Sequence, residues 1–165
     1  MAEIGRIRRR NDHKYPLVGI APAELAAWPR GPQSTKFLWW GKQRWQLEPN
    51  YSHFILVPGS QFGDESSWIV QTATLLSQDQ RSVTILINGG GISRKDFELS
   101  LESGRPVIAL SRTGRLADEL ATQPARHKLI TVVPRNADRQ IVQAVQTALA
   151  IKATSMPTRS LINAT

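Results

Sequence analysis

Short apolar runs alternate along the chain with longer segments whose apolar residues recur at helical spacing. The runs are typical of strands that are buried in a parallel sheet. They comprise residues 17–21, 54–57, 83–87, 106–110 and 128–133. The segments between them predict helices over 65–77, after Ser93, over 116–122 and after Asn136. We therefore expect an α/β fold, a Rossmann-like three-layer sandwich with a mainly parallel sheet.

Two of the predicted helices have a clear apolar face. On the helix over 65–77, this face comprises Trp68, Ile69, Thr72, Leu75 and Leu76. On the last helix, it comprises Ile141, Val142, Val145 and Leu149. Helical spacing puts each set on one side, so we expect both faces to pack on the sheet. Asp64 and Asn136 precede these helices and are candidate N-caps.

Two glycine turns link a strand to a helix in the middle of the chain. The first, 88–91, reads N-G-G-G, and the second, 111–115, reads S-R-T-G-R. Glycine permits positive φ and a close approach of the backbone to a ligand, and Ser93 with Asp96 forms a capping-box pattern for the helix that follows. Helix N-termini and arginines favour phosphate or carboxylate. These turns are the candidate ligand site of an open α/β sheet, and a plain strand-to-helix turn is the alternative for the glycine run.

Composition narrows the class of protein. The 165 residues carry a formal net charge of +8 and no cysteine, which excludes disulfides and thiolate zinc sites. We see no signal peptide and no membrane-spanning run, and we expect a cytoplasmic setting. Residues 1–14 are either the end of a helix, with Ile4 and Ile7 on one face, or disordered. Basic residues crowd 6–14, and we prefer to interpret them as a solvated or frayed end. The other basic residues are scattered without a nucleic-acid-binding motif, so we expect no specific nucleic acid partner.

Five stretches, taken together and in order, resemble a known family over roughly residues 15–121. They are L-V-G-I-A-P, L-E-P-N-Y-S-H-F-I-L-V, G-D-E-S-S-W-I, L-I-N-G-G-G and G-R-P-V-I-A-L-S-R-T-G-R-L-A-D. This set resembles the prokaryotic LSDAT domain of the SLOG superfamily, which is related to the cytosolic N-terminal region of TRP-melastatin channels. The resemblance implies a Rossmann-like domain that senses a nucleotide-derived ligand of the NAD or ADP-ribose type, with no cofactor or metal of its own and no catalytic residue.

The resemblance also implies the residues that contact the ligand. The main candidates are Asn88, Gly89, Gly90, Gly91, Thr113, Gly114 and Arg115. Glu48, Asn50, His53, Asp64 and Glu65 are secondary candidates. The chain departs from the family pattern at Tyr51, where His is usual, and at Arg112, where Gly is usual, which makes the second turn bulkier. Superfamily members that cleave nucleoside monophosphates carry P-G-G-x-G-T with a downstream Glu, and this chain has N-G-G-G-I-S-R-K-D instead.

The front of the chain differs most from the family pattern. Residues 1–14 contain no strand and glycine turn ahead of L-V-G-I-A-P, so the chain resembles a family domain without its first βα unit. We expect a basic segment over 1–14, one domain over 15–151 and a flexible tail over 152–165. An uncovered strand edge would favour a homo-oligomer or binding of an effector protein. Two alternatives to a ligand sensor stay open: a nucleotide N-glycoside hydrolase that uses Asp64, Glu65 or His53, and a structural remnant without a working site.

Overall fold

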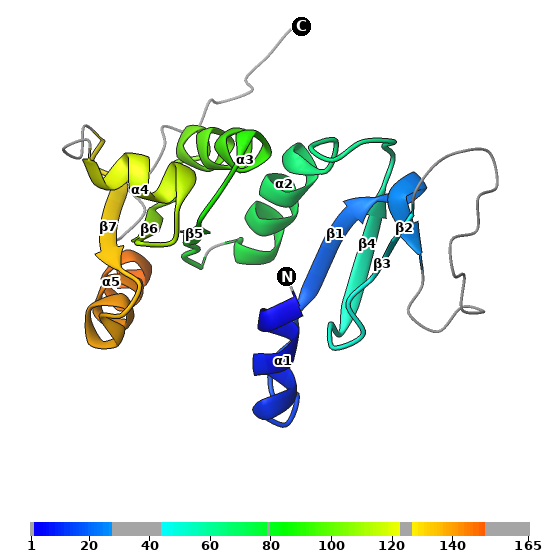
Figure 1. The fold of residues 1–165 in the computed structure, drawn as a ribbon, viewed down its shortest axis with the longest axis horizontal. Helices are drawn as coiled ribbons and strands as arrows, with labels where there is room; N and C mark the ends of the chain where they lie inside the picture. Colours follow the sequence, from blue (N-terminus) through cyan, green and yellow to red (C-terminus); the bar gives the residue numbers. More distant parts are fainter. Residues whose placement is uncertain (1, 28–43, 79, 123–126, 151–165) are drawn as a thin grey trace, which may run out of the picture. The chain divides into compact units, whose positions relative to one another are not determined.

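The structure is a computed structural model that describes residues 2–27, 44–78, 80–122 and 127–150 (Figure 1). Strands and helices alternate along these residues, and every strand pair is parallel. Parallel sheets flanked by helices are consistent with a Rossmann-like three-layer arrangement, which confirms the predicted fold class. The tail predicted over 152–165 lies outside the described residues.

The chain forms two compact units. The first comprises residues 1–72 with 91–99, and the second comprises 73–90 with 100–165. Helices α2 (Ser66–Ser77) and α3 (Gly91–Glu102) each have residues in both units.

Two parallel strand pairs form the sheets of the first unit. Strand β1 (Val18–Pro22) pairs with β4 (His53–Val57) over their whole length. The 3₁₀ helix η1 (Ala23–Leu25) then leads to the short pair of β2 (Ala26–Ala27) and β3 (Trp45–Gln46). The strands predicted over 17–21 and 54–57 are therefore confirmed, each within one residue at its ends.

Helix α1 (Ala2–Arg10) is anchored to the loop that precedes β4. Gly5 is buried so closely against this loop that a Cβ atom there would lie 2.9 Å from Cγ of Glu48. The Arg8 guanidinium donates hydrogen bonds of 2.9 Å to the carbonyl oxygens of Tyr15 and Asn50. The interpretation of this segment as a frayed end is therefore wrong, because the contacts of Gly5 and Arg8 fix the helix.

The second unit contains a three-stranded parallel sheet with the order β5-β6-β7. Its strands are β5 (Thr84–Ile87), β6 (Val107–Ser111) and β7 (Ile130–Pro134). Adjacent parallel pairing of the segments 85–87 and 107–110 is confirmed by the register Ile85↔Ile108 to Ile87↔Leu110. A central position is correct for β6 and wrong for β5, which is an edge strand of this sheet. Side chains of Ile85 and Ile87 are accordingly 46% and 54% exposed.

Helices α4 (Arg115–Thr122) and α5 (Asp138–Ala150) cover this sheet, and Figure 1 draws them on opposite sides of it. The core under α5 contains Ile108, Val133 and Ala148, with Ile141, Ala144 and Val145 packed against it. The predicted inner face of α5 is wrong at Val142 and Leu149, which are exposed. The helix is rotated so that the small Ala144 and Ala148 face the strands. On α2, the predicted face is likewise wrong at Trp68, Leu75 and Leu76, which are exposed.

The predicted helix caps are also misplaced. Helix α3 begins at Gly91, so Ser93 lies inside its first turn instead of capping it. The carbonyl of Ala137 accepts the first helical bond of α5 from Ile141, which puts Asn136 before the cap position. The Asp64 carboxylate accepts amide hydrogen bonds from the preceding loop and does not cap α2.

Candidate functional site

The two glycine turns meet at the carboxyl edge of the sheet in the second unit, because they follow the neighbouring parallel strands β5 and β6. The Thr113 hydroxyl joins them: it accepts a hydrogen bond of 2.7 Å from the Asn88 amide and donates one of 2.6 Å to the Leu110 carbonyl. The side chain of Asn88 also lies beside Gly114, where a Cβ atom would be 3.6 Å from Nδ2. The structure therefore brings Asn88 and Gly89 together with Thr113 and Gly114, as predicted.

Both turns use left-handed backbone conformations. Gly89 and Gly114 have φ of 108° and 99°, which glycine adopts without a steric cost. Asn88 has φ of 62°, a conformation that asparagine tolerates better than most residues. Arg112 and Arg115 have φ of 65° and 51°, so these two positions are strained. Glycine at the position of Arg112 would adopt this conformation without strain.

The first turn is open. No acceptor among the described residues takes the amides of Gly89 and Gly90. Beside this turn lies the Arg115 guanidinium, whose Nη1 would be 3.3 Å from a Cβ atom on Gly90. In the described part of the chain, that guanidinium has no hydrogen-bonding or ionic partner. Bare backbone and an unpaired cation therefore face the same space, which is an arrangement suited to an anion.

The second turn, in contrast, is closed by groups of the chain itself. The Asp118 carboxylate accepts hydrogen bonds from the amides of Arg112, Thr113 and Gly114. In the first turn of α4, the amides of Leu116 and Ala117 donate hydrogen bonds to the carbonyl oxygens of Gly89 and Asn88, at 3.2 and 3.0 Å. The helix N-terminus predicted to attract an anion therefore already holds a carboxylate. Sequence reasoning missed Asp118, although an acidic residue in the first turn of a helix is a recognisable signal.

A sequence model of the family described as "SLOG in TRPM, prokaryote" matches residues 1–153. The chain belongs to this family. A search of curated proteins found no match. The match includes both glycine turns, and it also includes helix α1, which lies ahead of the stretches that resemble the family in sequence.

The secondary candidates of this SLOG domain lie in the first unit, where they serve local structure. The Glu48 carboxylate accepts hydrogen bonds from the backbone and side-chain amides of Asn50. The His53 ring is 2.9 Å from the Ser52 hydroxyl. Gly91, the first residue of α3, also belongs to the first unit.

The two carboxylates that could serve a hydrolase in this SLOG domain are both engaged. Hydrogen bonds from the amides of Ser60 and Gln61 lower the pKa of Asp64 below its ordinary value. The Glu65 carboxylate accepts a hydrogen bond of 2.7 Å from the Gly63 amide. A carboxylate that is held ionised is a weak proton donor near neutral pH, so Asp64 is poorly suited to be a general acid.

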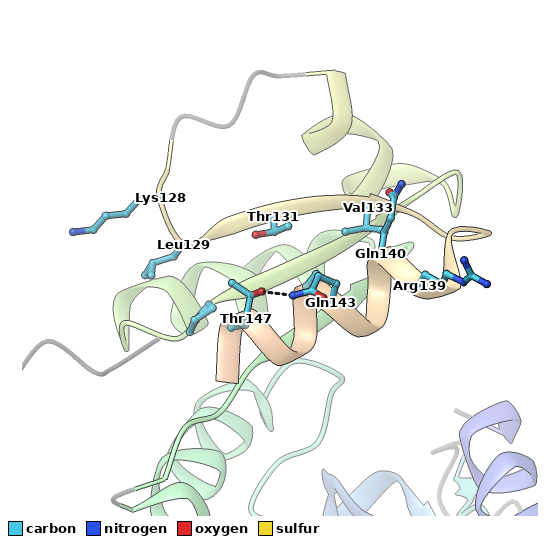
Figure 2. A pocket seen from close by; sticks show the side chains of 11 residues that line it. Lys128, Leu129, Thr131, Val133, Arg139, Gln140, Gln143 and Thr147 are labelled. Carbon is cyan, nitrogen blue, oxygen red and sulfur yellow. Dashed lines mark hydrogen bonds between the residues drawn. The ribbon is translucent and has the colours of Figure 1, made fainter. Parts of the chain in front are cut away.

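A groove of about 400 Å³ lies elsewhere in the second unit, between β7 and α5 (Figure 2). Its floor is mostly apolar, and Gln140, Gln143 and Thr147 of α5 form one side. Lys128 and Arg139 also line it. None of the residues of the glycine turns contributes to this groove, so it is separate from the candidate site of the SLOG domain.

Neither a metal site nor a membrane-spanning helix is found among the described residues of the SLOG domain. Within residues 2–27, 44–78, 80–122 and 127–150, no three His, Asp or Glu side chains are grouped so that they could hold a metal ion. Of the helices that the structure describes, none has both the length and the apolar character needed to cross a bilayer.

Proposed function

We propose that this SLOG domain is a cytoplasmic sensor module that binds a nucleotide-derived ligand of the NAD or ADP-ribose type through a phosphate group. The main support for the proposal is the unpaired Arg115 guanidinium. It lies beside the turn of Gly89 and Gly90, whose amides have no acceptor among the described residues. Membership of the SLOG family supports a nucleotide-related ligand. In this proposal, the amides of Gly89 and Gly90 and the guanidinium of Arg115 hold the phosphate.

The chemistry of these groups favours a phosphate over a neutral ligand. An arginine fork and two backbone N–H groups supply only donors and one positive charge, so they match an acceptor with several oxygens. Gly90 has no positive φ that would demand glycine. Its missing side chain therefore has a different use, which we take to be space for the phosphate next to Nη1 of Arg115.

Ligand-induced stabilisation tests the proposal. A panel of ADP-ribose, NAD, AMP and cyclic nucleotides should raise the melting temperature of the full chain with at least one member, because a ligand that binds only the folded state stabilises it. Gly90→Val should abolish that shift, since its branched side chain fills the space for the phosphate. Arg115→Gln should weaken binding at least about tenfold, a typical loss for a charge-assisted hydrogen bond.

Arg112→Gln is the matched control. Arg112 is in the same turn, is exposed and has the same left-handed conformation, but its guanidinium is not placed beside Gly90. Equal losses of ligand affinity in Arg112→Gln and Arg115→Gln would show only a general effect of positive charge, without a specific role for Arg115. If no ligand shifts the melting temperature of a well-folded wild-type chain, the structural remnant becomes the better interpretation.

A hydrolase is the alternative function, and the engaged carboxylates of Asp64 and Glu65 weigh against it. We expect no cleavage of nucleoside monophosphates above background. Turnover that disappears in Asp64→Asn or Glu65→Gln would replace the sensor proposal with an enzymatic one.

A further inference from the structure

The Asp118 carboxylate occupies the position in which a ligand anion would otherwise bind the second turn. Its Oδ1 accepts the amides of Arg112 and Thr113, and its Oδ2 accepts the amide of Gly114 at 3.1 Å. These three amides point at one carboxylate, which is the arrangement in which backbone nests bind free anions. Asp118 therefore acts as an anion that belongs to the chain itself.

The same carboxylate fixes the conformation from which Arg115 reaches the first turn. Asp118 holds the amides of residues 112–114, and the carbonyls of the first turn hold the amides of Leu116 and Ala117. Arg115 lies between these two sets of hydrogen bonds, in a left-handed conformation with φ of 51°. A strained conformation persists only where its surroundings determine it. Since Asp118 and Arg115 form no ion pair within 4.0 Å in the described residues, the guanidinium stays free for a ligand.

We propose that Asp118 is a positioning and specificity residue: it aims Arg115 at the first turn and restricts the site to one phosphate group, bound at Gly89 and Gly90. This inference rests on the proposed function and names the class of ligand that the site accepts. A second phosphate at the turn 112–114 would meet amides that are already used and a carboxylate of the same charge. The matching ligands are mononucleotides, or dinucleotides of which only one phosphate touches these turns.

Inorganic phosphate, followed by amide resonances of the full ¹⁵N-labelled chain at low ionic strength, tests the inference. In the wild type, we expect phosphate to shift the amides of Gly89 and Gly90 and the side-chain Nε–H of Arg115. The amides of residues 112–114 should stay unmoved, because Asp118 covers them. The Nε–H of Arg112 serves as the internal control.

Asp118→Asn is the decisive variant, since its side-chain oxygen can still accept an amide hydrogen bond while the negative charge is gone. We expect phosphate shifts to spread to the amides of Thr113 and Gly114. Phosphate affinity should rise about two- to fivefold, the size of one like-charge interaction at a protein surface. The gain should shrink at high salt. Asp118→Ala should lose the response of Arg115 Nε–H as well, because no acceptor then holds the amides of residues 112–114 that precede Arg115.

Three results would overturn the inference: phosphate shifts at residues 112–114 in the wild type, an unchanged pattern and affinity in Asp118→Asn, or no shift at either turn in any variant. A different result would refute only the proposed function. If phosphate binds at Gly89 and Gly90 as described while AMP, ADP-ribose and NAD all fail to bind, the selectivity of the turns stands and the nucleotide ligand falls.

Discussion

The two glycine turns of the second unit follow neighbouring strands and each leads into a helix, yet their backbone amides are used in opposite ways. At the first turn, the amides of Gly89 and Gly90 meet no acceptor among the described residues. At the second turn, Asp118 and the carbonyls of the first turn take the amides of residues 112–114, 116 and 117. Glycines and a helix start are therefore not sufficient for an anion site. Whether a turn can bind an anion depends on whether another group of the chain already accepts the hydrogen bonds of its amides.

The largest effect on stability should come from cutting the hydrogen bond that joins the two turns. Thr113→Val keeps the shape of the side chain but leaves the Asn88 amide without its acceptor. We expect a loss of about 1–3 kcal/mol in the free energy of unfolding, because Thr113→Val removes two hydrogen bonds that contribute about 0.5–1.5 kcal/mol each. Denaturant unfolding measures it. Thr113→Ser keeps the hydroxyl and should stay close to wild type, and equal losses in the two variants would contradict a role for the hydroxyl.

A smaller effect of opposite sign is expected at Arg112. A left-handed conformation costs a non-glycine residue about 1–2 kcal/mol. The greater flexibility of unfolded glycine offsets roughly 0.5–1 kcal/mol of this cost. Arg112→Gly should therefore stabilise the chain by up to about 1 kcal/mol, measured by thermal or denaturant unfolding. Arg112→Gln, which keeps the strain, should have no such effect, and destabilisation by the glycine would show that the arginine side chain contributes.

The smallest effect concerns Asp64 in the first unit, a second carboxylate that accepts hydrogen bonds from backbone amides. Asp64 accepts the amides of Ser60 and Gln61, which lowers its pKa below the ordinary value near 3.8. A lowered pKa in the folded state means that the stabilisation is complete above the unfolded value and is lost as the pH falls through the folded value. The melting temperature of the wild type should thus drop more steeply below about pH 4 than that of Asp64→Asn. If the melting temperatures of the two proteins depend on pH in the same way, the hydrogen bonds of Asp64 do not stabilise the folded state.

The sequence predicts those parts of the fold in which apolar residues are unbroken. The runs 83–87 and 106–110 are confirmed as adjacent parallel strands. Full burial explains the apolar run only in β6, because Ile85 and Ile87 of β5 are exposed. The inner face of α5 was predicted correctly at Ile141 and Val145 and wrongly at Val142 and Leu149, because hydropathy ranks these two large side chains above alanine. Small side chains at Ala144 and Ala148 allow a close approach to the strands, and close packing decided the orientation.

The candidate site was predictable in position but not in its hydrogen bonding. The strand–glycine–helix pattern located both turns, and the structure joins Asn88 to Thr113. Which amides stay free depends on the direction of one carboxylate, that of Asp118, and on two carbonyls of the other turn. The contacts with the two carbonyls depend on tertiary geometry, which spacing along one sequence does not contain, whereas Asp118 in the first turn of α4 was a recognisable local signal. The ligand contacts of both turns therefore stay predictions.

The two edges of the three-stranded sheet differ in a way that sets the direction in which it could grow. On β7, the Val107–Leu129 and Arg135–Ser111 bonds turn the odd-numbered residues toward β6. On the outward edge of β7, Val132 then offers both groups to an added strand, whereas the Ile130 amide is bonded to His127 and Pro134 has no N–H. On β5, the bond from Thr84 to Pro106 leaves the N–H and C=O groups of Ile85 and Ile87 facing outward. Within this unit, aggregation or templating by strand addition is therefore favoured at β5 over β7.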